Sequence, residues 1–167
     1  MPESPPLLLP ELARSLRTLG APRDAAGEAA HSAVFVPLLD ARARATTGDM
    51  EVALSALRGE ALGVRIEARV ADAAEAGEAD PARARARGAR ARELLEPLRR
   101  DLRSLDTLAV RARGADLKSP EWEAWVGQLR RVFSSADDAC RAIARLLAEP
   151  VATVPARRWF GRRGKET

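Results

Sequence analysis

The chain has 167 residues, of which 46% are hydrophobic and only 4% aromatic, and this length and composition predict one domain with a hydrophobic core of its own. Its one cysteine, Cys140, excludes an intramolecular disulfide framework and is typical of a reducing compartment. The formal net charge of +4 comes from residues 156–167, because the rest of the chain carries equal numbers of acidic and basic side chains.

No stretch of the sequence has the composition of a targeting or membrane-spanning segment. The apolar run Leu7–Leu9 is too short for a secretory signal and lacks a basic residue before it. The longest uncharged stretch, residues 29–39, falls well short of the roughly 20 apolar residues that a transmembrane helix needs. We therefore expect a cytoplasmic protein with no transmembrane segment.

The first predicted element is a short helix over residues 10–19, after an irregular lead over residues 1–9. Gly20 and Pro22 follow it and should end it. Apolar residues recur along this segment at helical spacing, namely Leu9, Leu12, Leu16 and Leu19. We expect this short helix to act as a lid or strut on a larger bundle.

Two longer helices are predicted next. Asp24 is the expected N-cap of a helix that runs to about residue 47, and Pro37 should kink it or split it in two. A single helix is then predicted from Asp49 to about Ala76. Its predicted apolar seam consists of Met50, Leu54, Leu57, Ala61, Val64, Ala68 and Ala71, with Leu62, Ile66 and Val70 broadening the face.

The fourth predicted helix begins at Asp80 and Pro81, runs to about Arg113 and ends at Gly114, with Pro97 expected to bend it near the middle. Its predicted seam consists of Ala91, Leu95, Leu98, Leu102, Leu105, Ala109 and Ala112.

The fifth predicted helix begins at Ser119, as N-cap, with Pro120 in its first turn, and ends at Pro150. Its predicted seam consists of Trp122, Val126, Leu129, Phe133, Ala136, Cys140, Ile143 and Leu147. We interpret Trp122, Trp125 and Cys140 as packing residues rather than as a ligand-stacking pair and a nucleophile.

These elements predict an all-α fold, an antiparallel up-down helical bundle of four long helices plus a short N-terminal helix, within a single domain over residues 10–150. Connections of about 2–5 residues make sequence neighbours antiparallel, and no run has the alternation of a strand. Residues 151–167 are expected to form a flexible basic tail. A homodimer that shares a helix seam remains an open alternative.

His31 is the only histidine, and it lies three residues after Glu28, a spacing that supplies metal ligands in some helical bundles. The standard di-iron site needs a second such motif, so it is excluded. His31 continues the apolar line of its helix, which favours a packed structural histidine. A phosphorelay or acid–base role, or a metal site using His31 and Glu28, is the alternative, and we expect no cofactor.

Arginine alternates with small residues from Arg83 to Arg92. We interpret this stretch as a helix with a solvated, arginine-coated face. The alternative is a phosphate-binding ridge that uses Arg83, Arg87 and Arg90.

The chain ends in RRWFGRRGKET, residues 157–167. This is not a phosphate-binding loop, because too few residues separate Gly161 from Gly164 and Glu166 follows Lys165 where that loop requires Ser or Thr. Basic residues flank two aromatic ones, a composition typical of docking segments. The candidate docking residues are Arg157, Arg158, Trp159, Phe160, Arg162, Arg163 and Lys165.

The sequence as a whole favours a non-enzymatic interaction, regulatory or scaffold module that docks a protein partner through this tail. The alternatives are binding of nucleic acid or of an anionic membrane through the tail and the Arg83–Arg92 ridge, an internal site at Glu28 and His31, and a terminus with no binding role.

Overall fold

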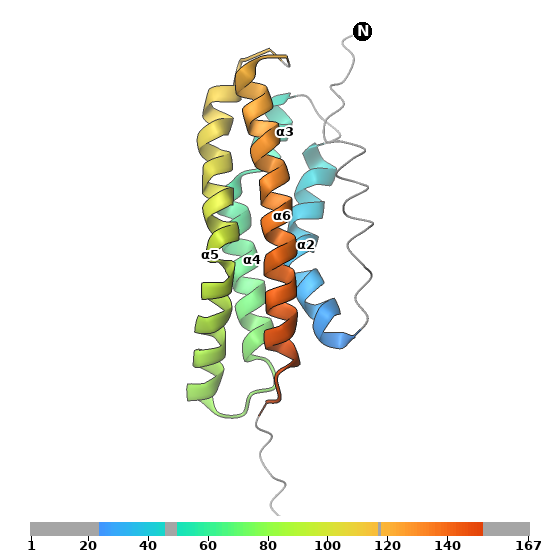
Figure 1. The fold of residues 1–167 in the computed structure, drawn as a ribbon, viewed down its shortest axis with the longest axis vertical. Coiled ribbons are helices and arrows are strands. Elements are labelled where there is room, and N and C mark those ends of the chain that lie inside the picture. Colours follow the sequence, from blue (N-terminus) through green and yellow to red (C-terminus); the bar gives the residue numbers. More distant parts are fainter. Residues whose placement is uncertain (1–23, 46–49, 117, 152–167) are drawn as a thin grey trace, which may run out of the picture.

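The computed structural model describes residues 24–45, 50–116 and 118–151, which form α-helices and no β-strand (Figure 1). The helices are α2 (Ala25–Ala45), α3 (Met50–Ala56), α4 (Gly59–Glu75), α5 (Pro81–Ala112) and α6 (Pro120–Ala148). The predicted short helix over residues 10–19 and the tail beyond Val151 lie outside the described residues.

Four of these helices form the walls of an antiparallel bundle. α4 packs against α5, α5 against α6, α6 against α2, and α2 closes the ring against α4, whereas α4 and α6 face each other diagonally with little contact. The chain runs up along α2 and α5 and down along α4 and α6 in Figure 1. The prediction of an all-α antiparallel up-down bundle is therefore confirmed.

Local capping signals define where three of the helices begin. Side-chain oxygens of Asp24, Asp80 and Ser119 accept hydrogen bonds from backbone N–H groups of the first turns of α2, α5 and α6, at 2.7, 2.9 and 3.3 Å. Gly77 and Gly114 follow α4 and α5 with φ of 77° and 76°, a left-handed conformation that glycine adopts without strain. The predicted bounds of α5 and α6 agree with these elements.

The single helix predicted from Asp49 to Ala76 is wrong, because the structure divides its described part into α3 and α4. The physical reason is a cap supplied from α5. Asp106 accepts hydrogen bonds from the backbone N–H of Gly59 at 2.6 Å and of Glu60 at 2.8 Å, so a new helix N-terminus is stabilised at this point. The residue before α4, Arg58, provides no side-chain cap.

The break also changes which face of α4 is buried. Leu54 and Leu57 are buried as predicted, but Ala61, Val64 and Ala68 are exposed, Val64 to 54%. Because the helix is interrupted before Gly59, the spacing of apolar residues in α3 does not carry over into α4. The residues predicted only to broaden the face, Leu62, Ile66 and Val70, are its core positions.

The two internal prolines do not interrupt their helices. α2 continues through Pro37 and α5 through Pro97, so Pro37 does not split its helix. Phe35 and Leu38, on either side of Pro37 in sequence, are each 1% exposed, and packing of both halves against the bundle compensates for the lost backbone hydrogen bond.

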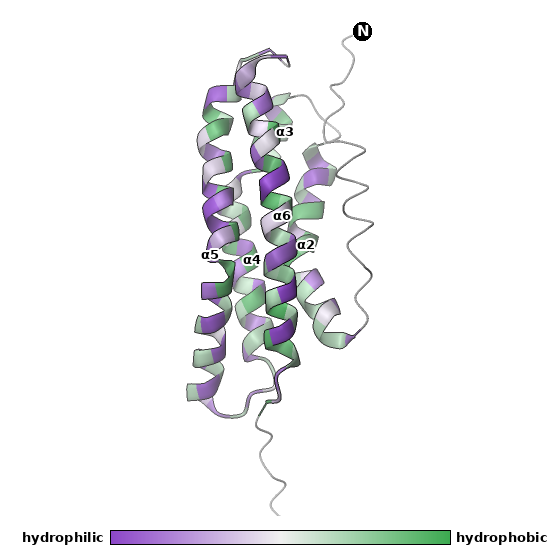
Figure 2. Ribbon diagram, in the orientation of Figure 1, coloured by the Kyte–Doolittle hydropathy of each residue, from purple (hydrophilic) through white to green (hydrophobic). Residues whose placement is uncertain are grey.

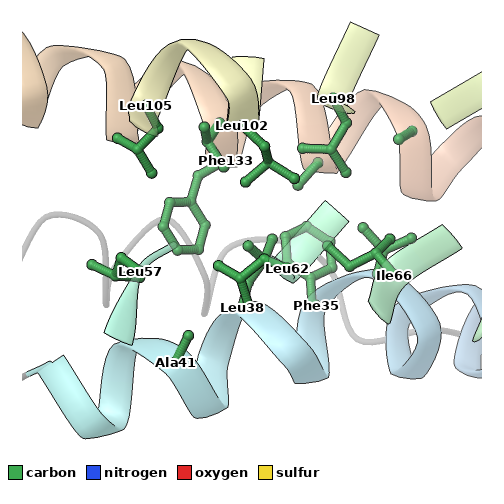
Figure 3. Packing of buried hydrophobic residues seen from close by; sticks show 14 of the residues in the cluster. Phe35, Leu38, Ala41, Leu57, Leu62, Ile66, Leu98, Leu102, Leu105 and Phe133 are labelled. Carbon is green, nitrogen blue, oxygen red and sulfur yellow. The ribbon is translucent and has the colours of Figure 1, made fainter. Parts of the chain in front are cut away.

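Large aliphatic and aromatic side chains from all the helices meet in one continuous core (Figure 3). Leu98, Leu102 and Leu105 of α5 face Phe35 and Leu38 of α2 across this core. Hydrophilic residues recur along the outer sides of α5 and α6, as the hydropathy colouring shows (Figure 2). The predicted α5 seam is buried at every position except Ala109, which is half-buried, and in the α6 seam Val126, Cys140 and Leu147 are half-buried.

One polar residue is buried with this core among the described residues. Gln128 is 6% exposed, and its Nε2 donates to the backbone carbonyl of Asp101 at 3.0 Å. The Ser135 hydroxyl donates to the carboxylate of the same aspartate. These bonds join α5 and α6, and a satisfied polar pair of this kind favours one alignment of two helices.

Candidate functional site

The structure places His31 in a packing environment. Its ring lies against Phe35, one turn later on α2, with ring centroids 5.2 Å apart and planes tilted by 35°. The histidine is half-buried, whereas Glu28 is exposed. Among the described residues, no group of three or more His, Cys, Asp or Glu side chains is arranged to hold a metal ion. The ring contact with Phe35 is the interaction that the structure gives the His31 side chain.

Arg87, a member of the predicted ridge, points into the bundle end rather than toward solvent. Its Nε donates to the carbonyl of Ala74 at 2.8 Å, and its Nη2 donates to the carbonyl of Leu146 at 3.0 Å. These carbonyls belong to the last turns of α4 and α6, and that of Leu146 also accepts from the backbone N–H of Glu149 at 3.2 Å. Arg87 therefore caps two helices from a third.

The other two ridge residues pair with carboxylates of the bundle. Arg83 lies 3.7 Å from Asp80, and Arg90 lies 3.0 Å from Glu149, the residue after α6. Both pairs are exposed, so each contributes at most about 1 kcal/mol to stability. The Arg83 and Arg90 side chains remain 64% and 58% exposed, so each pair places a carboxylate beside the arginine without burying its charge.

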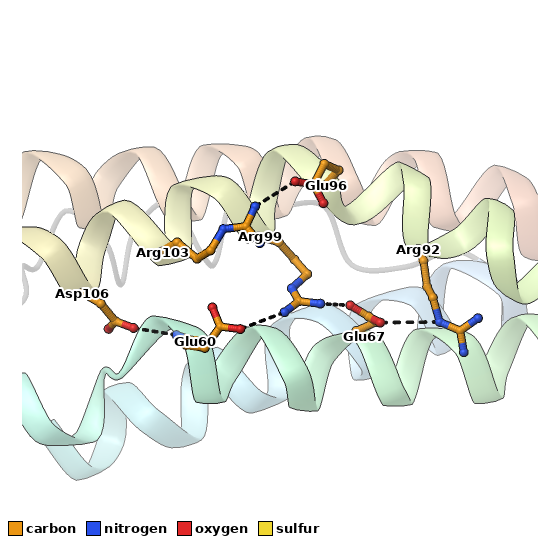
Figure 4. A network of polar contacts seen from close by, with 7 residues as sticks. All are labelled: Glu60, Glu67, Arg92, Glu96, Arg99, Arg103 and Asp106. Atoms are coloured by element: carbon orange, nitrogen blue, oxygen red, sulfur yellow. Dashed lines mark hydrogen bonds and ion pairs between the residues drawn. The ribbon is translucent and has the colours of Figure 1, made fainter.

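Sequence reasoning missed an ion-pair network between α4 and α5 (Figure 4). Arg99, whose side chain is 18% exposed, contacts Glu67 and lies 3.1 Å from Glu60, and Arg92 lies 3.5 Å from Glu67. The available signal was spacing: Glu60 and Glu67 lie seven residues apart, as do Arg92 and Arg99. Opposite charges at matching seven-residue intervals are typical of two helices that pack side by side.

Two of the surface depressions lined by described residues open to solvent. The first, of about 410 Å³, lies where α6 ends, and it is lined by Glu78, Arg83, Ala86, Arg87, Pro150 and Val151. The second, of about 390 Å³, lies between α2 and α4, and it is lined by Ala29, Ser32, Ala33, Arg69, Asp72 and Ala73. Neither lining contains the histidine or the cysteine.

Trp122 and Trp125 fill the core near the start of α6, as predicted for packing residues. They are 7% and 0% exposed, and their rings stack with centroids 5.0 Å apart. The tail residues Arg157, Arg158, Trp159, Phe160, Arg162, Arg163 and Lys165 lie outside the described residues.

Cys140 is half-buried on α6, and its environment makes it a poor nucleophile. Burial raises the pKa of the Cys140 thiol from 9.0 to about 11, and Asp137 adds to the rise while Arg141 opposes it.

Because the thiolate is the reactive form, alkylation of Cys140 by iodoacetamide should be slow at pH 7 and rise about tenfold per pH unit up to pH 10. Mass spectrometry of the intact chain measures this rate, with glutathione as the reference thiol. A rate that levels off near pH 9, as glutathione's does, would contradict the raised pKa.

None of the helices in the described part of the chain is long and apolar enough to cross a membrane. Searches with the sequence and the structure found no matching family model, no matching curated protein and no matching solved structure.

Proposed function

We propose that the protein is a non-enzymatic interaction module, in which a helical bundle docks a protein partner through its basic-aromatic tail. The observation that carries this proposal is the distribution of charge. The described bundle contains 20 basic and 20 acidic residues, whereas residues 156–167 alone carry the net charge of +4. The excess positive charge that could attract a partner therefore lies in residues 156–167.

The contacts that the ridge arginines make favour a protein partner over nucleic acid. Binding of a long polyanion would gain from a second cationic surface, but Arg83 and Arg90 lie beside carboxylates and Arg87 is bonded to backbone carbonyls. The tail also contains Trp159 and Phe160 between its arginines. Tryptophan and arginine are enriched among the residues that dominate protein–protein binding energies.

The test compares the full chain with a 1–155 truncation and with two paired variants, Trp159→Ala/Phe160→Ala and Arg162→Ala/Arg163→Ala. Each is immobilised and exposed to cell lysate, duplex DNA and anionic liposomes at about 50 and about 200 mM salt. We expect a stoichiometric protein partner whose binding is lost in the truncation and the aromatic variant, and is only weakly dependent on salt.

Three results would contradict the proposal. A partner retained equally by the truncation would remove the tail from the interaction. DNA binding that falls by orders of magnitude over this salt range would identify a nucleic-acid protein. Liposome binding that requires both aromatic and basic residues would identify a membrane-associated one.

A further inference from the structure

The outer side of α2 is apolar, unlike the outer sides of α5 and α6. Side chains at spacings of three and four form a stripe, here called the outer α2 stripe, which consists of Ala25, Ala29, Ser32, Val36 and Leu39. The first three are exposed and the last two are half-buried. Hydrophobic residues predominate over residues 25–39 of α2, the part that carries the stripe (Figure 2).

The inner side of the same helix is also apolar. Ala30, Val34, Leu38 and Ala41 are at most 1% exposed in the bundle core. A helix that is apolar on both sides is typical of one that lies between two layers, rather than of one that faces water. The described helices supply one of those layers.

Beside the outer α2 stripe lies the depression of about 390 Å³ between α2 and α4. Ala29, Ser32 and Ala73 form part of its lining, and such small side chains let another helix approach closely. Arg69 and Asp72 add one charge of each sign to the lining. The surface therefore fits an amphipathic helix with large apolar side chains.

We propose that the occupant is residues 10–19 of the same chain, docked through Leu12 and Leu16 onto the outer α2 stripe. Helical spacing places these leucines on one face and Arg14 and Arg17 on the other. The stripe spans roughly 21 Å and a helix over residues 10–19 roughly 15 Å, both at about 1.5 Å per residue, so the segment fits within the stripe.

The connection favours this occupant over a second copy of the chain. Residues 20–23 reach at most roughly 14 Å, enough for two adjacent helices whose axes lie about 8–10 Å apart. So short a tether holds the segment near the start of α2 at an effective concentration in the millimolar range. The inference does not depend on the proposed role of the tail.

The test measures thiol accessibility in the full chain. Val36→Cys places a thiol in the middle of the outer α2 stripe, and Val64→Cys places one at a position that is 54% exposed on α4. We expect Val36→Cys to react with a maleimide about tenfold more slowly than Val64→Cys. Adding Leu12→Glu and Leu16→Glu should then raise its rate about tenfold.

The control is Arg14→Gln/Arg17→Gln, which changes the net charge of the segment by the same amount on the opposite face and should leave the rate unchanged. Native Cys140 reports on folding, because general unfolding would raise its rate as well. The proposal would be overturned if Val36→Cys reacts equally fast with and without the two leucine substitutions while Cys140 stays protected. It would also be overturned by protection that depends on chain concentration together with a dimer in sedimentation, which would identify a second copy as the occupant.

Discussion

Gly59→Ala is expected to lower the free energy of unfolding by about 3 kcal/mol, at the upper end of the cost of overpacking. A Cβ atom at this position would lie 1.9 Å from the carbonyl oxygen of Leu102 and 2.6 Å from its carbonyl carbon. These are backbone atoms of α5, so the overlap is relieved only if α4 and α5 separate. Urea unfolding followed by circular dichroism measures the change.

Two other glycines provide matched controls for this substitution. At Gly88 a Cβ would lie 2.1 Å from Glu75 Oε1, a comparable overlap, but that atom ends a flexible side chain that can rotate away. At Gly127 it would meet no atom within 4 Å. We expect Gly88→Ala to change stability by less than about 1 kcal/mol and Gly127→Ala to stabilise α6 by about 0.5–1 kcal/mol. If Gly59→Ala and Gly88→Ala are equally stable, the close approach of α4 to α5 is wrong.

Trp125→Ala is expected to lower the free energy of unfolding by about 3–5 kcal/mol, since it removes a large buried ring and leaves a cavity. Trp125 is 0% exposed, and its ring stacks on Trp122. The midpoint of urea unfolding should fall accordingly, and near-ultraviolet circular dichroism should lose part of its tryptophan signal.

Val110→Ala is the control for Trp125→Ala, because Val110 is 73% exposed and its truncation should change stability by less than about 0.5 kcal/mol. Trp125→Phe should fall between the two, because it keeps an aromatic ring in the core. Equal stabilities of Trp125→Ala and Val110→Ala would show that Trp125 is not a core residue.

The helices α5 and α6 could be predicted from sequence because their signals are local. Asp80 and Ser119 cap the helices that they precede, and a long apolar seam follows each. The break before α4 has no such local signal. Its cap comes from Asp106, 47 residues from Gly59, so it becomes visible only when α4 and α5 are packed together.

The candidate sites likewise depend on contacts between residues that lie far apart in the sequence. The alternation of arginines suggested a single outward ridge, but the partners of Arg87 are backbone carbonyls 13 and 59 residues away. Every residue has a backbone carbonyl, so the order of residue types does not show which carbonyls will accept a hydrogen bond. The contact of His31 with Phe35 is local and agrees with the sequence interpretation of a packed histidine.

The two carbonyls held by Arg87 have a mechanical consequence for an attached tail. Leu146 lies in the last turn of α6, a few residues before the chain continues beyond Val151. A force applied to the chain beyond Val151 would act first on this last turn of α6. Because Arg87 joins Leu146 to α5 and to Ala74 of α4, the load is shared by three helices rather than unwinding one. Arg87 thus anchors the last turn of α6 to both α4 and α5.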